Sequence, residues 1–143
     1  MSFLLDTNVI SEWTKPQPDP GVIKWLAGLD EDQAFLSVIS FAEIRRGVEK
    51  MPRGRKRVHI ETWLQNDLPA RFELRILPID EVIAQLWGIV MDRSARQGKT
   101  IGAMDAFLAA TALDRDLTLV TRNTKDFGGL EVKLLNPWSE SSR

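Results

Sequence analysis

The sequence predicts an α/β/α sandwich, in which helices cover a mainly parallel central sheet of about five strands. Three observations support this prediction. Short apolar runs alternate along the chain with longer segments whose apolar residues recur at helical spacing. The first run, Phe3-Leu4-Leu5, is apolar throughout, as expected of a strand buried on both faces. The 143 residues include 43% hydrophobic and 27% charged residues, which is typical of a globular domain.

The expected strands are the short apolar runs that end at polar residues or turns. They span residues 3–5, 34–38, 74–79, 117–121 and 132–135. Because helical segments alternate with these runs, the strands are expected to lie parallel. No repeat or linker divides the chain, so residues 1–138 are expected to form one domain and residues 139–143 a frayed tail.

The expected helices are the segments whose apolar residues fall on one helical face. They span residues 7–13, 22–29, 39–51, 53–73, 82–97 and 104–113. Polar residues that can cap a helix precede or begin some of them, and these are Thr7 or Asn8, Ser37 or Ser40, and Asp80. The segment 15–21 ends the first helix, because its prolines cannot continue a helical backbone.

The charge and residue content exclude several classes of protein. A formal net charge of −1 is not that of a globally basic nucleic-acid coat, although it permits a local basic face. The chain has no cysteine, which excludes disulfides and thiolate metal sites. No apolar run reaches the roughly 18 residues of a membrane span, and Asp6 stands where a signal peptide is apolar. A cytoplasmic protein is therefore expected.

Asp6 is the first candidate site residue, because it directly follows the first expected strand. In open α/β sheets, ligands bind just beyond the carboxyl ends of the strands. Glu43 lies early in the helix after the second strand, and Asp105 begins the helix before the fourth. In a parallel sheet these carboxylates can converge on one edge.

Two of these carboxylates also have a structural explanation. Asp105 shares a helix face with Leu108 and other apolar residues, where a charge is costly unless it is paired. The N–H groups of the helix N-terminus can satisfy it. Glu43 can pair with Arg46 on a solvated surface. Only the joint position with Asp6 favours a functional site.

Three uncompensated carboxylates near one point would repel one another and raise their own pKa values. A divalent cation removes this conflict. Oxygen ligands from Asp6, Glu43 and Asp105, in a chain with no Cys and one His, favour Mg²⁺ or Mn²⁺ over Zn²⁺. Such cations typically act on phosphate esters, where they orient water, lower its pKa and neutralise the charge of the transition state.

Further polar residues follow the fourth expected strand. Thr121, Asn123 and Asp126 supply a hydroxyl, an amide and a carboxylate within a few residues. The amide oxygen of Asn123 can bind a metal-held water. Asp126 either takes part as a carboxylate or caps the turn before Phe127.

Four short motifs, in order and at the expected spacing, resemble those of PIN-domain nucleases. They are Leu5-Asp6-Thr7-Asn8, Ser40-Phe41-Ala42-Glu43-Ile44, Asp105-Ala106 and Thr121-Arg122-Asn123-Thr124-Lys125-Asp126-Phe127. Each motif is weak by itself, but the ordered set covers nearly the whole chain. The likeness is greatest to the VapC-type toxins of bacterial toxin–antitoxin pairs, including the branch that ends in Asn-Pro-Trp, as residues 136–138 do here.

This resemblance implies a PIN-like fold and a metal-dependent endoribonuclease that hydrolyses RNA phosphodiester bonds with Mg²⁺ or Mn²⁺. By motif position, Asp6, Glu43 and Asp105 correspond to the catalytic, metal-binding carboxylates. The fourth catalytic position, often aspartate in the family, is Asn123 here, which weakens any second metal site; Asp126 lies near enough in sequence to substitute in part. The residues implied to support these ligands are Thr7, Asn8, Thr121 and Asp126.

The resemblance also implies partners. They are an RNA substrate, a second copy of the chain in a homodimer, and a small cognate antitoxin whose C-terminal segment passes over the toxin. An antitoxin arginine in the acidic pocket would suit a carboxylate cluster and compete with the cation.

A dense basic segment begins beside Glu43. Its first members, which we expect to hold an RNA backbone leading to the metal, are Arg45, Arg46, Lys50 and Arg53. The alternative is a solvated connection between helices, which is what charge runs usually are.

Two other functions compete with the nuclease. A phospho-acceptor signalling domain also binds Mg²⁺ at an acidic strand edge, but it needs adjacent acidic residues after the first strand, where Thr7 and Asn8 stand here. A PIN-like module that has lost catalysis and only binds a partner is disfavoured by the intact carboxylates. The departure at Asn123 keeps this second alternative open.

Overall fold

The structure is a computed structural model that describes residues 1–138, so the expected tail of residues 139–143 lies outside the described residues. A five-stranded parallel sheet runs through its middle in the order β3-β2-β1-β4-β5. The strands are β1 (Phe3–Leu5), β2 (Ala34–Ser37), β3 (Ile76–Leu77), β4 (Thr118–Val120) and β5 (Leu134–Leu135). The α/β class and the parallel sheet predicted from the sequence are confirmed.

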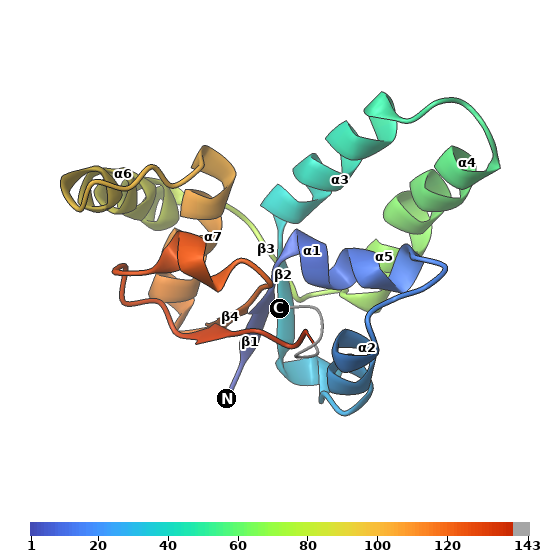
Figure 1. Cartoon of the computed structure of the whole chain (residues 1–143), viewed down its shortest axis with the longest axis horizontal. Helices are drawn as coiled ribbons and strands as arrows, with labels where there is room; N and C mark the ends of the chain where they lie inside the picture. The colour runs from blue at the N-terminus through green and yellow to red at the C-terminus, as the bar shows by residue number, and fades with distance from the viewer. Residues whose placement is uncertain (139–143) are drawn as a thin grey trace.

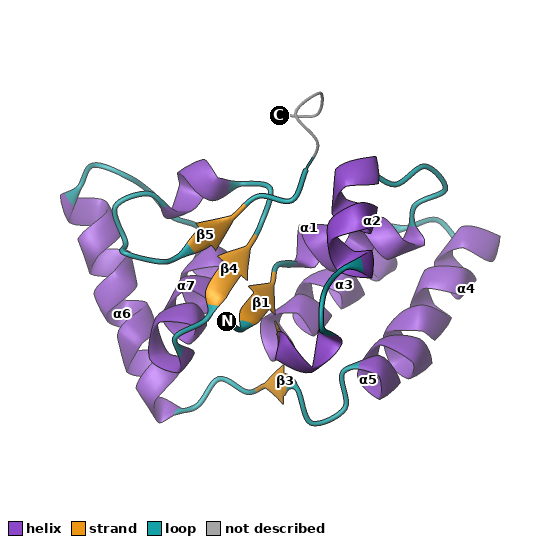
Figure 2. Ribbon diagram, turned by 90° about the horizontal axis from the view of Figure 1, so that it is seen from below, coloured by secondary structure: helices purple, strands orange, loops and turns teal. Residues whose placement is uncertain are grey.

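Helices cover both faces of the sheet (Figures 1 and 2). One face carries α1 (Thr7–Ile10), α2 (Pro20–Ala27), α3 (Val38–Lys50), α4 (Arg55–Thr62) and α5 (Leu68–Arg71). The other face carries α6 (Glu81–Arg96) and α7 (Ala103–Arg115). Short helical turns complete the chain, namely η1 (Ser11–Thr14), η2 (Glu31–Gln33), the π-helix η3 (Trp63–Asp67) and η4 (Thr124–Phe127).

The central strand β1 contributes to two separate cores. Leu4 packs with Leu108 of α7 and Ile83 of α6, whereas Leu5 packs with Val9 and with Leu68 of α5. Neighbouring residues of a strand point to opposite faces of the sheet, so each face needs its own apolar residue. This explains why the strand is apolar throughout and why its first polar residue marks the sheet edge.

Side-chain caps decide where the helices begin. The predicted caps at Asp80 and Ser37 are confirmed. At the first helix the prediction of Thr7 or Asn8 is wrong, because Oδ1 of Asp6 accepts a hydrogen bond from the backbone N–H of Thr7 at 2.6 Å. Asp6 therefore ends β1 and caps α1 at once, which fixes the position of its carboxylate.

Two predicted segments differ from the structure. The helix expected over 53–73 is interrupted by the π-helix at Trp63–Asp67, just before a proline that lacks the N–H an α-helix would use. The strand expected over 74–79 is confined to Ile76–Leu77, because Leu74 has a φ of 67° and is 96% exposed. Within residues 1–138, no helix is long and apolar enough to span a membrane.

Candidate active site

The candidate site lies where the strand order reverses. From β1 the chain moves outward through β2 and β3, then returns to the other side of β1 as β4 and continues to β5. In open parallel sheets this switch point leaves a crevice at the carboxyl ends of the two central strands, where ligands bind. Asp6 follows β1 and Thr121 follows β4 at this point.

Asp6 is buried and held in place by both central strands. Its Oδ2 accepts a hydrogen bond from Thr121 Oγ1 at 2.7 Å, and its Oδ1 accepts from the N–H of Thr7 at 2.6 Å. Thr121 Oγ1 in turn accepts from the backbone N–H of Asn123 at 3.1 Å, so its only proton is left for the carboxylate. The orientation of Asp6 is therefore set before any ligand binds.

Thr7 connects this strand end to Glu43. Its hydroxyl donates to Oε1 of Glu43 at 2.7 Å and lies 2.9 Å from Oγ of Ser40. Ser40 is buried and precedes Glu43 by three positions, so the two share a face of α3. The sequence analysis named Ser40 as a possible helix cap and as part of the second motif but assigned its hydroxyl no role in the site, although its spacing from Glu43 was a signal of a shared site.

The carboxylates of the site raise one another's proton affinity. Burial raises the pKa of Asp6 to about 6; the hydrogen bond from Thr121 opposes this, and the charges of Asp105 and Glu43 add to it. Burial also raises the pKa of Asp105, with further repulsion from Glu43 and Asp126. These effects join the carboxylates from three helical segments and one strand end into a single electrostatic cluster.

The donor set fits a hard divalent cation by its chemistry. It consists of mutually repelling carboxylates, which favour Mg²⁺ or Mn²⁺. Among residues 1–138, however, no group of three or more Asp, Glu, His or Cys side chains is close enough to hold a metal ion as arranged. The carboxylates share a site without forming a closed cage, and Mg²⁺ usually keeps several waters and uses one or two carboxylates.

Asn8 adds a second polar feature beside Asp6. Its Oδ1 is buried and has no hydrogen-bond partner in the described part of the chain. A buried acceptor without a partner costs free energy and is typical of sites that bind water or an ion. Asn8 follows Asp6 by two positions in sequence, and its role as a supporting residue stays a prediction.

The two candidates for the fourth acidic position occupy different environments. Asn123 is exposed, and it contacts the site through its backbone N–H rather than its amide. Asp126 belongs to η4, and its charge acts on Asp105. Asp126 and Asp105 line one cavity of about 460 Å³. Asp126 is therefore better placed than Asn123 to add negative charge.

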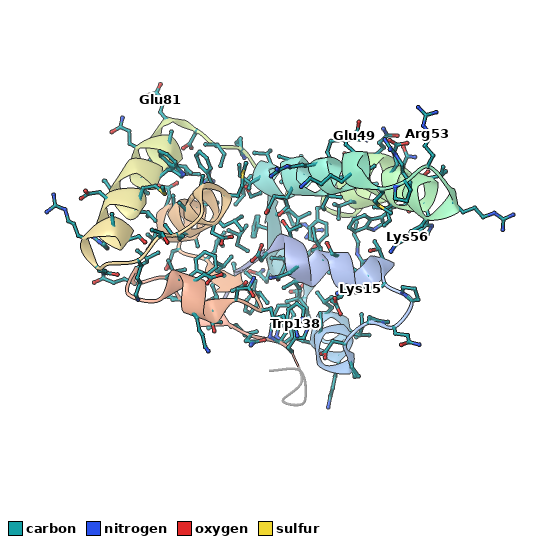
Figure 3. The ribbon with its side chains drawn as sticks, turned by 45° about the horizontal axis from the view of Figure 1, so that its top comes forward. Lys15, Glu49, Arg53, Lys56, Glu81 and Trp138 are labelled. Carbon is teal, nitrogen blue, oxygen red and sulfur yellow. The ribbon has the colours of Figure 1, made fainter. Side chains whose placement is uncertain are left out.

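The predicted RNA-binding residues divide into two groups. The guanidinium of Arg45 donates to Glu61 at 2.8 Å and lies 3.7 Å from Glu49, so it ties α3 to α4. The other three are exposed and form no ion pair with any residue in the range 1–138, and these are Arg46, Lys50 and Arg53. Figure 3 shows Arg53 at the far end of α3 and α4, away from the sheet.

A family model described as the PIN domain matches residues 3–130. The chain belongs to the PIN-domain family. Toxin FitB of Neisseria gonorrhoeae is 39% identical to this PIN domain over 138 residues, covering 96% of this chain and 99% of that protein. VapC ribonuclease Y4jK of Sinorhizobium fredii is 34% identical over 136 residues, covering 95% and 97%. The predicted resemblance to VapC-type toxins is confirmed.

Solved structures share the whole fold of this PIN domain. The structure of FitAB bound to an IR36 DNA fragment has a TM-score of 0.89 and 38% identity, and covers 96% of each chain. VapBC2 from Rickettsia felis, bound to a DNA fragment from its promoter, has a TM-score of 0.79 and 25% identity over 97% of this chain and 100% of that chain. The toxin fold therefore extends from the first strand to the last.

Proposed function

We propose that this PIN-domain toxin is a metal-dependent endoribonuclease that hydrolyses RNA phosphodiester bonds. The supporting observation is the buried Asp6 at the switch point, on whose proton affinity Asp105 and Glu43 both act. A cation beside such a cluster of like charges favours its ionised form. Relatives named for this activity include the tRNA(fMet)-specific endonuclease VapC of Shigella flexneri, 29% identical over 138 residues.

In this proposal Asp6, Glu43 and Asp105 hold Mg²⁺ or Mn²⁺. A bound divalent cation supplies charge neutralisation for the phosphate and a water of lowered pKa. The chain's own groups keep the carboxylates ionised and oriented, because Thr121 and the Thr7 N–H donate to Asp6 and the Thr7 hydroxyl donates to Glu43. Asp126 adds negative charge, whereas Asn123 holds Thr121 through its backbone.

We also propose that a cognate antitoxin inhibits the enzyme. A toxin–antitoxin complex from Klebsiella pneumoniae has a TM-score of 0.71 and 26% identity, covering 96% of this chain and 99% of that chain. The acidic cluster suits a guanidinium, which forms paired hydrogen bonds to a carboxylate and would displace the cation. Inhibition would then be relieved by excess Mn²⁺ more readily than by excess monovalent salt.

A homodimer is proposed on the apolar surface of α6. Val82 and Ile89 are 56% and 55% exposed and lie two helical turns apart on one face. A second copy of the chain is the occupant that the family resemblance implies. Sedimentation of the purified toxin tests this, since Val82→Glu and Ile89→Glu would shift a dimer to monomer.

Two further expectations remain predictions. They are a cytoplasmic location and RNA contact by Arg46, Lys50 and Arg53.

The deciding experiment measures cleavage of single-stranded RNA by the purified chain with Mn²⁺ or Mg²⁺, with and without a chelator. Asp105→Asn keeps the shape of the side chain and removes its charge, so we expect at least a 100-fold loss of cleavage. The matched control is Asp92→Asn, on an aspartate of α6 that is exposed and paired with Arg96. It should cleave as the wild type does.

Two observations favour a second function, a PIN-like binding module without catalysis. The described carboxylates do not form a ready metal group, and the fourth position is Asn123. A folded wild-type protein that neither cleaves RNA nor binds Mn²⁺ in titration calorimetry would support this module and overturn the nuclease.

A further inference from the structure

A cavity of about 460 Å³ opens beside Asp105, between the loop that precedes α7 and the turn η4. Polar groups dominate its lining, which includes Lys99, Thr100, Gly102, Asp105, Lys125 and Asp126. The sequence analysis assigned no role to the loop or to the two lysines. The cavity adjoins the carboxylate cluster, because Asp105 belongs to both.

Two hydrogen bonds hold the walls of this cavity together. Nε2 of Gln97 donates to the carbonyl of Gly129 at 2.8 Å, and Nζ of Lys99 donates to the carbonyl of Gly128 at 3.0 Å. Gly129 has a φ of 80°, and a Cβ there would lie 2.4 Å from the amide oxygen of Gln97. The positive φ favours glycine at this position, and the two hydrogen bonds join the loop that precedes α7 to the loop that follows η4.

The charges around the cavity are separated rather than paired. Lys125 and Asp126 are neighbours in sequence and both line the cavity, yet Lys125 forms no ion pair within the part of the chain that the structure describes. Lys99 donates to a carbonyl and forms no ion pair with a residue in the range 1–138. Gly102 caps α7 without a side-chain acceptor, so backbone donors of the first turn face the same region. The same cavity is thus lined by cationic groups and by Asp105, one of the carboxylates of the proposed metal site.

We propose that this cavity binds the phosphodiester backbone of the RNA strand beside the scissile bond, with Lys125 as the main phosphate contact and Lys99 as the second. The inference rests on the proposed function and assigns its substrate contacts. A phosphate anion can accept hydrogen bonds from both ammonium groups, while the cation neutralises the carboxylates that line the same cavity. Lysine contacts of this kind position a strand without reading its sequence.

Binding of a fluorescein-labelled oligouridylate is measured by fluorescence anisotropy with Ca²⁺ in place of Mg²⁺, so that a divalent cation still neutralises the carboxylates, and a gel of the same samples checks that the strand is uncut. We expect Lys125→Gln to weaken binding three- to tenfold. Each lost phosphate contact also makes the slope of log K against log salt shallower by about 0.7 for a single strand. Lys125→Arg should restore both quantities. The matched control is Lys133→Gln, because Lys133 is exposed and paired with Asp116.

Thermal melting of each variant shows whether its fold is intact before binding is compared. If Lys125→Gln melts like the wild type and binds RNA with an unchanged Kd and salt slope, the inference is overturned. It is also overturned if this variant keeps RNA binding but loses binding of a polyglutamate peptide, since the ligand is then an acidic protein segment. If the wild type neither binds nor cleaves RNA, the proposed function fails. If the wild type cleaves RNA and Lys125→Gln binds it equally well, the proposed function stands and only this phosphate contact is ruled out.

Discussion

The hydroxyl of Thr121 donates a 2.7 Å hydrogen bond to Oδ2 of Asp6, although the two residues are 115 positions apart in the chain. The sheet creates this contact, because β1 and β4 pair in parallel with Leu5 opposite Val120, and each strand is followed directly by one partner. The hydrogen bond favours the ionised carboxylate and lowers the pKa of Asp6, against the effects of burial and of Asp105. Thr121 therefore keeps Asp6 in the form that a cation needs.

Thr121→Val should weaken Mn²⁺ binding. Valine has nearly the shape of threonine and lacks the donor, so the pKa of Asp6 should rise further above its ordinary value. A lost hydrogen bond to the ionised form costs that form about 1.5 kcal/mol, roughly one pKa unit, so the affinity should fall several-fold at pH 6, close to the pKa of Asp6, and less at higher pH. Titration calorimetry measures this directly. Thr121→Ser keeps the hydroxyl and should bind within about twofold of wild type, and equal affinity in Thr121→Val would show that the donor has no such role.

Asp6→Asn should stabilise the metal-free protein at neutral pH. The folded-state pKa of Asp6 is about 6, above the ordinary value of 3.8, so the folded chain binds this proton more tightly than the unfolded chain. The free energy of unfolding from this group therefore falls as pH rises from 3.8 to 6, and the full penalty applies above that range. Asparagine has no such penalty, and its oxygen still accepts from Thr7.

Urea unfolding with chelator present tests this expectation. We expect Asp6→Asn to exceed wild type by about 1 to 3 kcal/mol near pH 7.5, with the difference shrinking as pH approaches 4. Asp92→Asn serves as the surface control and should stay within about 0.5 kcal/mol. A gain for Asp6→Asn that is the same at both pH values would show that charge burial is not its cause.

Cation binding should raise the melting temperature of the wild type. A ligand that binds only the folded state at 100 times its Kd adds about 2.7 kcal/mol to the free energy of unfolding, which is several degrees for a chain of this size. Differential scanning fluorimetry with Mn²⁺, compared with Na⁺ at equal ionic strength, measures the shift. The shift should shrink below about pH 6, where protons compete for Asp6. An undiminished shift in Asp105→Asn would remove that residue from the metal site.

Features that depend on local residue pattern were accessible from the sequence. The apolar run at β1 and its first polar residue placed Asp6 at the sheet edge, and helical spacing placed Asp105 in the first turn of its helix. The cap of α1 was missed because the choice among Asp6, Thr7 and Asn8 depends on the residue at which the strand ends, and such boundaries are poorly defined by sequence.

Features that depend on contacts between distant segments were not accessible. The hydrogen bond from Lys99 to Gly128 joins two loops, and neither loop has a periodic pattern that would indicate a neighbour. The backbone conformation of Leu74 was not accessible either. The apolar residues around it predicted a longer strand, but its positive φ delays the start of the strand to Ile76. Backbone conformation at such positions is decided by tertiary packing rather than by residue preference.

Glu12 is the buried charge that the sequence analysis overlooked, and it should matter for stability. It is 2% exposed, its Oε1 accepts from the backbone N–H of Asp19 at 2.8 Å, and its Oε2 pairs with Lys15. Asp19 in turn caps α2 by accepting from the N–H of Val22 at 3.1 Å. Glu12 therefore holds the proline-rich segment that connects η1 to α2.

Glu12→Ala should lower the free energy of unfolding by about 2 to 4 kcal/mol, because it removes a buried side chain that accepts from the part-buried N–H of Asp19, and it opens a void. Glu12→Gln keeps an acceptor oxygen and should lose roughly half as much. Glu49→Ala is the matched control, since that glutamate is 59% exposed and its ion pairs are on the surface, where such pairs contribute less than about 1 kcal/mol. Urea unfolding of the three variants at one pH gives the comparison. If Glu12→Ala is as stable as Glu49→Ala, the connection between η1 and α2 is held by the prolines and apolar contacts alone.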